Sequence, residues 1–165
     1  MITQPAFTAN DAIRWYETTS TGWRKLLHSN PEILALPCSI AKTSNVAHFL
    51  QHIVAVELRC AERIVGKSET SYDNIPFDSV EAIYATHDRA SALFNEALAS
   101  GIDWEQTIDF ATRTTGAGRA TLKTMFFHAI FHSIRHYAQL ATLIRQHGYT
   151  TDWPADYLFM GATRA

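Results

Sequence analysis

The run RATLKTMFFHAIFHSIRHYAQLATLIRQH, residues 119–147, constrains the fold more than any other part of the chain. When it is drawn as a helix at about 100° per residue, apolar side chains cover it nearly all the way round. A helix of this kind is normally buried on most of its faces. We therefore expect a long helix, closed by Gly148, that packs against other helices.

Three earlier segments also repeat apolar residues at helical spacing, and each is bounded by residues that favour helix ends. Capping-box patterns mark the starts of the first and the third, and a proline or a glycine follows each of the three. The predicted helices run from Thr8 to Pro31, from a cap at Thr43 or Ser44 to Gly66, and from Asp78 to Gly101.

Two segments fall outside this pattern. The alternation in WEQTIDFATRT, within residues 102–118, fits either a short pair of strands or an extended excursion. The tail carries Trp153, Tyr157, Leu158 and Phe159. A solvated tail would not hold so many large apolar groups, so we expect it to pack back onto the helices.

Four long helices with short connections predict an all-α protein, a four-helix bundle of up-down order with a longer crossover before the last long helix. The length fits one domain over residues 1–165. A chain of this length buries roughly two-thirds of its unfolded surface. The 47% hydrophobic content supplies such a core without disulfide bonds.

Charge, hydropathy and cysteine usage exclude several classes of protein. The net charge is −2 and the 14 basic residues are scattered, which disfavours nucleic-acid binding. No stretch of about 18 apolar residues occurs that could span a membrane, and the N-terminal residues lack a signal-peptide pattern. Cys38 and Cys60 form no C-x-x-C pair, so we expect reduced thiols in a cytoplasmic protein.

The eight histidines are many for this length, and their spacing indicates chemistry. His128, His132 and His136 lie on one stripe of the long helix. Burying imidazoles on an apolar helix costs free energy unless they have partners, and a metal ion is such a partner. Histidines four residues apart on a helix can share one ion at metal–nitrogen distances of about 2.0–2.1 Å.

A third ligand must come from another helix, and the second predicted helix offers His48 and His52, again four apart. His52 lies at the edge of the apolar face and can point inward, whereas His48 sits a turn nearer the solvent end. The alternative is that these histidines are ordinary core or surface residues. His28, His87 and His147 lie near helix ends or on polar faces, and we expect them to be solvated.

Other catalytic patterns are missing from the sequence. It contains no H-E-x-x-H, no E-x-x-H, no glycine-rich phosphate loop and no G-x-S-x-G. These absences disfavour zincin proteases, di-iron carboxylate bundles, nucleotide-binding loops and serine hydrolases.

The run NVAHFLQHIVAVELRCAERIVG and the block MFFHAIFHSIRHYAQLATLIRQHG resemble the DinB family, the DinB/YfiT-like metalloproteins. The most specific feature is H-x-x-x-H followed three residues later by glutamine. The resemblance covers most of the chain, including DWPADYLFMGA, and implies the four-helix bundle. It also implies a facial three-histidine site, which in this sequence is His52, His132 and His136, with His48 and His128 outside the core motif.

The resemblance further implies a homodimer and a bound divalent ion, zinc or nickel, with manganese or iron as alternatives. Characterised members of the family depend on thiols: mycothiol-dependent maleylpyruvate isomerase and bacillithiol S-transferases. Our hypothesis is a metal-dependent enzyme that activates a low-molecular-weight thiol for transfer to a small-molecule substrate, or for an isomerisation. The alternatives are a metal-dependent hydrolase of a small amide or ester, and a non-catalytic, metal-stabilised, stress-associated dimer.

Two further residues are candidates for contact with a ligand. Gln139, one turn after His136, can orient a ligand or a water, or can simply bond another helix. Arg59, about two turns after His52, can meet a substrate anion or form a surface salt bridge. Neither cysteine has a catalytic motif, and we expect Cys60 to be a packed core residue.

Overall fold

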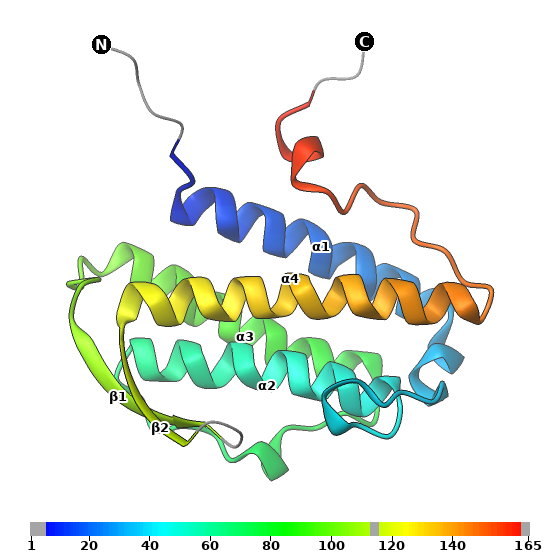
Figure 1. Ribbon diagram of the computed structural model, residues 1–165, viewed down its shortest axis with the longest axis horizontal. Helices are drawn as coiled ribbons and strands as arrows, with labels where there is room; N and C mark the ends of the chain where they lie inside the picture. Colours follow the sequence, from blue (N-terminus) through cyan, green and yellow to red (C-terminus); the bar gives the residue numbers. More distant parts are fainter. Residues whose placement is uncertain (1–5, 113–115, 163–165) are drawn as a thin grey trace.

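The computed structural model describes residues 6–112 and 116–162 (Figure 1). The described part is mostly helical, as predicted, with one small antiparallel sheet. The four long helices are α1 (Ala9–Ser29), α2 (Val46–Ile64), α3 (Val80–Ala99) and α4 (Leu122–Gln146). The sheet consists of β1 (Thr107–Thr112) and β2 (Gly116–Thr121), and short 3-10 turns cover Pro31–Ala35, Ile40–Lys42, Tyr72–Asn74 and Tyr157–Met160. Within these described residues, no helix combines the length and the apolar character needed to cross a bilayer.

Polar side chains cap the first turns of the helices. At α1 the cap is Thr8, in the predicted capping box. The cap predicted for α2 lies one or two residues too early, because Asn45 accepts from the His48 N–H at 2.9 Å. Thr43 is not the cap, since its hydroxyl donates to the Ile40 carbonyl at 2.8 Å and closes a 3-10 turn.

α3 and α4 also begin later than predicted. Ser79, and not Asp78, is the residue whose side chain caps α3. α4 begins at Leu122, because the three residues before it extend β2, where Arg119 is the register partner of Asp109. Pairing with a neighbouring strand therefore outweighs the helical pattern at the start of this run.

Of the two alternatives for residues 102–118, the structure contains the pair of strands, which form a hairpin. Its register runs from Thr107 opposite Thr121 to Thr112 opposite Gly116. The hairpin lies outside the helices (Figure 1), and the Arg63 guanidinium of α2 donates to the Ala111 carbonyl of β1 at 3.2 Å. This bond ties the hairpin to α2.

The core lies between the long helices. α2 packs against both α3 and α4, and α1 packs against α4 (Figure 1). One apolar cluster forms around Phe49 and Tyr137, and a second forms around Phe94 and Phe126. α4 contributes to both clusters, so one side of it is buried along its whole length. The opposite side, which carries Lys123, Phe131 and Arg135, is exposed, so the expected burial of most faces is met only in part.

The tail packs back onto α1 in part. The Trp153 ring lies 5.3 Å from the Trp23 ring. Gly22 permits this approach, because a Cβ at that position would lie 2.2 Å from the Trp153 ring. Leu158 and Phe159 remain 72% and 50% exposed. The expected packing is therefore found at Trp153 and at Tyr157, whose ring lies 5.4 Å from that of Trp15 on α1, but not at Leu158 and Phe159.

A buried polar network joins all four long helices. The Glu57 carboxylate of α2 is fully buried, and one of its oxygens accepts from the Ser133 hydroxyl of α4 at 2.7 Å. The other oxygen lies 2.9 Å from Nδ1 of His87 on α3. The hydroxyl of Tyr16 on α1 lies 2.9 Å from the same nitrogen. Because Ser133 faces Glu57, the network fixes the rotation of α4 against α2.

The prediction that His87 is solvated is wrong, because its side chain is only 3% exposed. Asp88 and Arg89, which follow it, are exposed, and their charges suggest a polar helix face. Tyr84 and Ala90, on either side, are nevertheless fully buried. The carboxylate that pairs with His87 comes from another helix, so the local pattern cannot reveal it. His28 and His147 are exposed, as predicted.

His87 forms a buried ion pair. Burial alone would lower the pKa of this imidazole, but the Glu57 and Glu17 carboxylates outweigh burial and raise the pKa to about 10. The Glu17 carboxylate lies 3.5 Å from Nε2. Burial raises the pKa of the Tyr16 and Tyr84 hydroxyls that line the ring, so both remain neutral. At neutral pH the ring is an imidazolium held between two carboxylates.

We expect the free energy of unfolding to fall as the pH rises from about 6.5 towards 10, by about 1.4 kcal/mol per pH unit at most. The pKa of His87 is raised in the folded state. Its stabilisation is therefore complete below the unfolded pKa and is lost as the pH passes through the folded value. Urea unfolding at a series of pH values measures the slope.

The His87→Gln variant is the control, because it removes this titration and keeps the tyrosines and cysteines that respond to high pH. Its slope between neutral pH and pH 9 should be shallower than that of the wild type. Equal slopes would show that His87 is not charged in the folded protein.

Candidate metal centre

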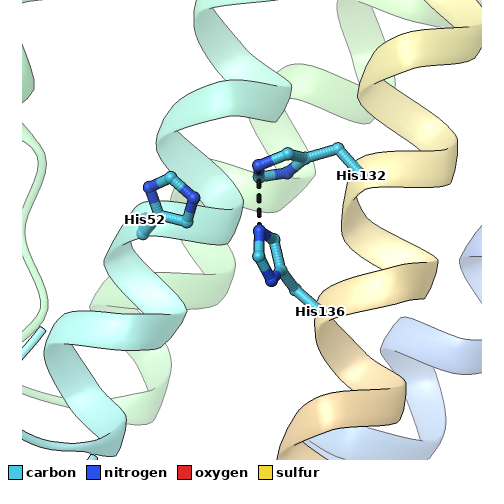
Figure 2. A group of neighbouring side chains, drawn as sticks. All are labelled: His52, His132 and His136. Atoms are coloured by element: carbon cyan, nitrogen blue, oxygen red, sulfur yellow. Dashed lines mark hydrogen bonds between the residues drawn. The ribbon is translucent and has the colours of Figure 1, made fainter. Parts of the chain in front are cut away.

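Three histidines from two helices face one another between α2 and α4 (Figure 2). His52 comes from α2, and His132 and His136 come from successive turns of α4. One ring nitrogen of each lies within 4.8 Å of the other two. The structure thus brings together the three residues that the family resemblance singles out.

The spacing of the nitrogens suits one ion. Metal–nitrogen bonds of about 2.0–2.1 Å place two coordinating nitrogens about 3–3.5 Å apart. The Nε2 atoms of His132 and His136 are already 3.1 Å apart. His52 completes the group from the facing helix, with a ring nitrogen within 4.8 Å of those of the other two histidines (Figure 2).

Burial keeps the two α4 imidazoles neutral. His132 and His136 are 8% and 6% exposed, whereas His52 is half-buried. Burial, followed by the neighbouring His136 and His52 rings, lowers the pKa of His132 to about 2. Burial also lowers the pKa of His136. Neutral imidazole is the form that ligates a metal, so the site is prepared for binding at physiological pH.

Gln139 orients one ligand. Its Oε1 accepts from Nδ1 of His136 at 2.6 Å, so the proton of that ring sits on Nδ1. The lone pair of Nε2 then points at the centre of the cluster. A second hydrogen bond of this kind is the usual way in which a protein fixes the tautomer of a metal-binding histidine.

His132 carries an orphaned nitrogen. Among the described residues, its buried Nδ1 has no hydrogen-bond partner. Its Nε2 faces the Nε2 of His136, and only one of these two atoms can donate to the other. An incompletely bonded buried ring costs free energy. A metal ion between the two Nε2 atoms would take both as ligands once the proton of His132 sits on Nδ1, the tautomer that His136 already has. The donor set therefore fits a divalent ion.

The other candidate residues lie around this cluster or apart from it. His128 is exposed, and its ring centroid is 5.6 Å from that of His132. His48 is not in the cluster, and its ring stacks on Phe77 at 5.7 Å. The Arg59 guanidinium donates to the Glu69 carboxylate at 2.7 Å, which is the salt-bridge alternative for this residue.

Two features of the site escape the sequence pattern. Arg135 donates from its guanidinium to Nε2 of His136 at 3.3 Å. Its place within the H-x-x-x-H motif, next to His136, is the only signal that could have drawn attention to it. Ser133, which anchors α4 to Glu57, gives no signal of its own, because the buried carboxylate lies 76 residues away in the sequence.

Comparison with known proteins identifies the family. The family model described as DinB family matches residues 14–163, nearly the whole chain. A search of curated proteins found no match. With this match, and with a histidine cluster that is compatible with metal binding, the chain belongs to the DinB family.

Proposed function

We propose that the protein binds one divalent ion through His52, His132 and His136 and uses it to activate a low-molecular-weight thiol, for transfer to an electrophile or for an isomerisation. The observation that carries this proposal is the convergence of three imidazole nitrogens, within 4.8 Å, from two packed helices. The thiol chemistry rests on family membership, since known relatives depend on thiols. The ion is zinc or nickel, with manganese or iron as alternatives, because imidazole suits all four.

A bound ion would supply Lewis acidity, which lowers the pKa of a coordinated thiol and makes it a better nucleophile. Three protein ligands leave a position open, as catalytic sites do. The residues of this chain prepare that position. Gln139 fixes the tautomer of His136, and Phe49 packs against the same ring in a T-shaped contact at a centroid distance of 5.1 Å. Burial keeps solvent away from the α4 ligands.

We also infer that the four long helices form the up-down bundle of the family, with the hairpin as part of the crossover before α4. The packing of α2 against α3 and α4, and of α1 against α4, supports this arrangement. In such a bundle, side chains on facing helices build the metal site.

Two alternatives predict different behaviour. A hydrolase would act on a small amide or ester without any thiol, and it would need a general base. Within the described residues, no carboxylate belongs to the histidine cluster, which favours the thiol hypothesis. A non-catalytic, metal-stabilised dimer would lose thermal stability on chelation and would turn over nothing.

We expect the protein to assemble as a homodimer through an aromatic surface on α4. Phe131 is 44% exposed and its ring stacks on that of Phe7, at 5.9 Å. The Tyr157 ring packs against Phe7 at 5.3 Å. Exposed apolar patches of this kind mark protein interfaces. Sedimentation velocity should show a dimer for the wild type and a monomer for Phe131→Glu, and a dimer in both would place the interface elsewhere.

Metal content tests the proposed ligands. After incubation with zinc or nickel, the wild type should retain about one equivalent by elemental mass spectrometry, and His52→Ala and His132→Ala almost none. His147→Ala is the matched control, because His147 is exposed just beyond α4 and should not matter. Full occupancy in His52→Ala would confine the site to α4. An empty wild type would remove the metal from the proposal.

Thiol dependence tests the chemistry. The metal-loaded protein, with bacillithiol, mycothiol or cysteine, should accelerate displacement of chloride from 1-chloro-2,4-dinitrobenzene, in which the thiolate sulfur forms the new bond and chloride leaves. Chelated protein and the His132→Ala variant should show only the uncatalysed rate. Hydrolysis of 4-nitrophenyl acetate without thiol would instead favour the hydrolase. No turnover in either assay would favour the non-catalytic alternative.

A further inference from the structure

The two helices that carry the histidines offer no carboxylate to the site. α4 contains no aspartate or glutamate along its entire length. α2 contains two glutamates, and both are buried. Glu57 is bonded to Ser133 and His87, and Glu62 accepts from the backbone N–H and the hydroxyl of Thr70 at 2.7 and 2.6 Å. Neither can neutralise a cation held by the histidines.

Arg135 adds positive charge at the same place. Its side chain is exposed, and its guanidinium lies 3.3 Å from Nε2 of His136. Within residues 6–112 and 116–162, no ion pair joins Arg135 to an acidic group. Its charge also helps to lower the pKa of His132 and His136, after the larger effect of burial. The cluster therefore faces a guanidinium that lacks a counter-charge.

This arrangement has an electrostatic consequence for any ion that binds. Three neutral imidazoles leave the full charge of a divalent cation uncompensated. The guanidinium donates to the lone pair of His136 that the ion would take, so ion and guanidinium compete for one atom. Once displaced from Nε2, Arg135 remains beside the open side of the cluster with its donors free. An anionic ligand would satisfy both positive groups.

We propose that Arg135 is the anion-binding residue of this site: it binds the carboxylate of a ligand whose other donor atom is held at the three histidines. The site then selects thiols, or electrophiles, that carry a carboxylate next to the reacting atom. The planar guanidinium matches a carboxylate with two parallel hydrogen bonds, which a lysine cannot reproduce. This proposal rests on the proposed function, since it requires a metal at His52, His132 and His136.

Cobalt(II) provides a spectroscopic test that does not depend on turnover. The protein is loaded with cobalt and titrated, without oxygen, with mercaptoacetate and with its methyl ester, and thiolate binding is followed by the cobalt absorption bands. Arg135→Gln should weaken the binding of mercaptoacetate at least about tenfold, the value of one of the two charge-assisted hydrogen bonds, and leave the ester unchanged. Arg135→Lys should recover only part of this loss.

The matched control is Arg145→Gln, which removes an exposed arginine from the same helix, ten positions beyond Arg135. It should bind both probes as the wild type does. An equal loss for both probes in Arg135→Gln, or no loss for either, would overturn the role of Arg135 while leaving the metal site in place. Failure of mercaptoacetate to alter the cobalt spectrum of the wild type would also overturn it. Failure to retain cobalt would overturn the proposed function together with it.

Discussion

The buried Glu57 carboxylate is the group on which the rest of the structure depends. A charge without exposure to water is costly unless it is paired and hydrogen-bonded, and Glu57 is both. Its two oxygens take bonds from α3 and α4, so the three helices can pack in only one rotational setting. A core of leucines and phenylalanines alone would tolerate small rotations of α4. The polar bonds do not, because any rotation leaves a buried oxygen unsatisfied.

The position of the histidine cluster depends on the rotation of α4 that this network fixes. On a helix, Ser133 points about 100° away from His132, so turning the serine towards Glu57 turns the histidines towards α2. Four of the five positions from His132 to His136 thereby meet different surroundings: a ligand, an anchor, and a guanidinium beside the next ligand. The fold and the site are therefore coupled through one turn of helix, and the buried ion pair positions the ligands without touching them.

Much of this could be predicted from the sequence, and the rest could not, for physical reasons. Helical spacing predicts the four helices and the shared face of His132 and His136, because both depend on neighbours along the chain. The start of α4 and the burial of His87 depend instead on partners from distant segments: Asp109 in β1 for the former, and Glu57 in α2 for the latter. Local patterns cannot report such partners. The choice of His52 over His48 is intermediate, since the edge of an apolar face indicates it and only packing places the ring.

The charges around the site indicate more about its ligand than the three histidines do alone. A metal site with carboxylate ligands carries part of its own counter-charge, whereas three neutral imidazoles carry none. This protein buries both acidic residues of α2, has none in α4, and leaves Arg135 beside the ligands. Such a site is most stable when an anion enters with, or after, the metal. A thiolate that also bears a carboxylate would compensate the charge of the metal ion and that of the Arg135 guanidinium. The electrostatic and chemical requirements of the site therefore point to the same class of molecule.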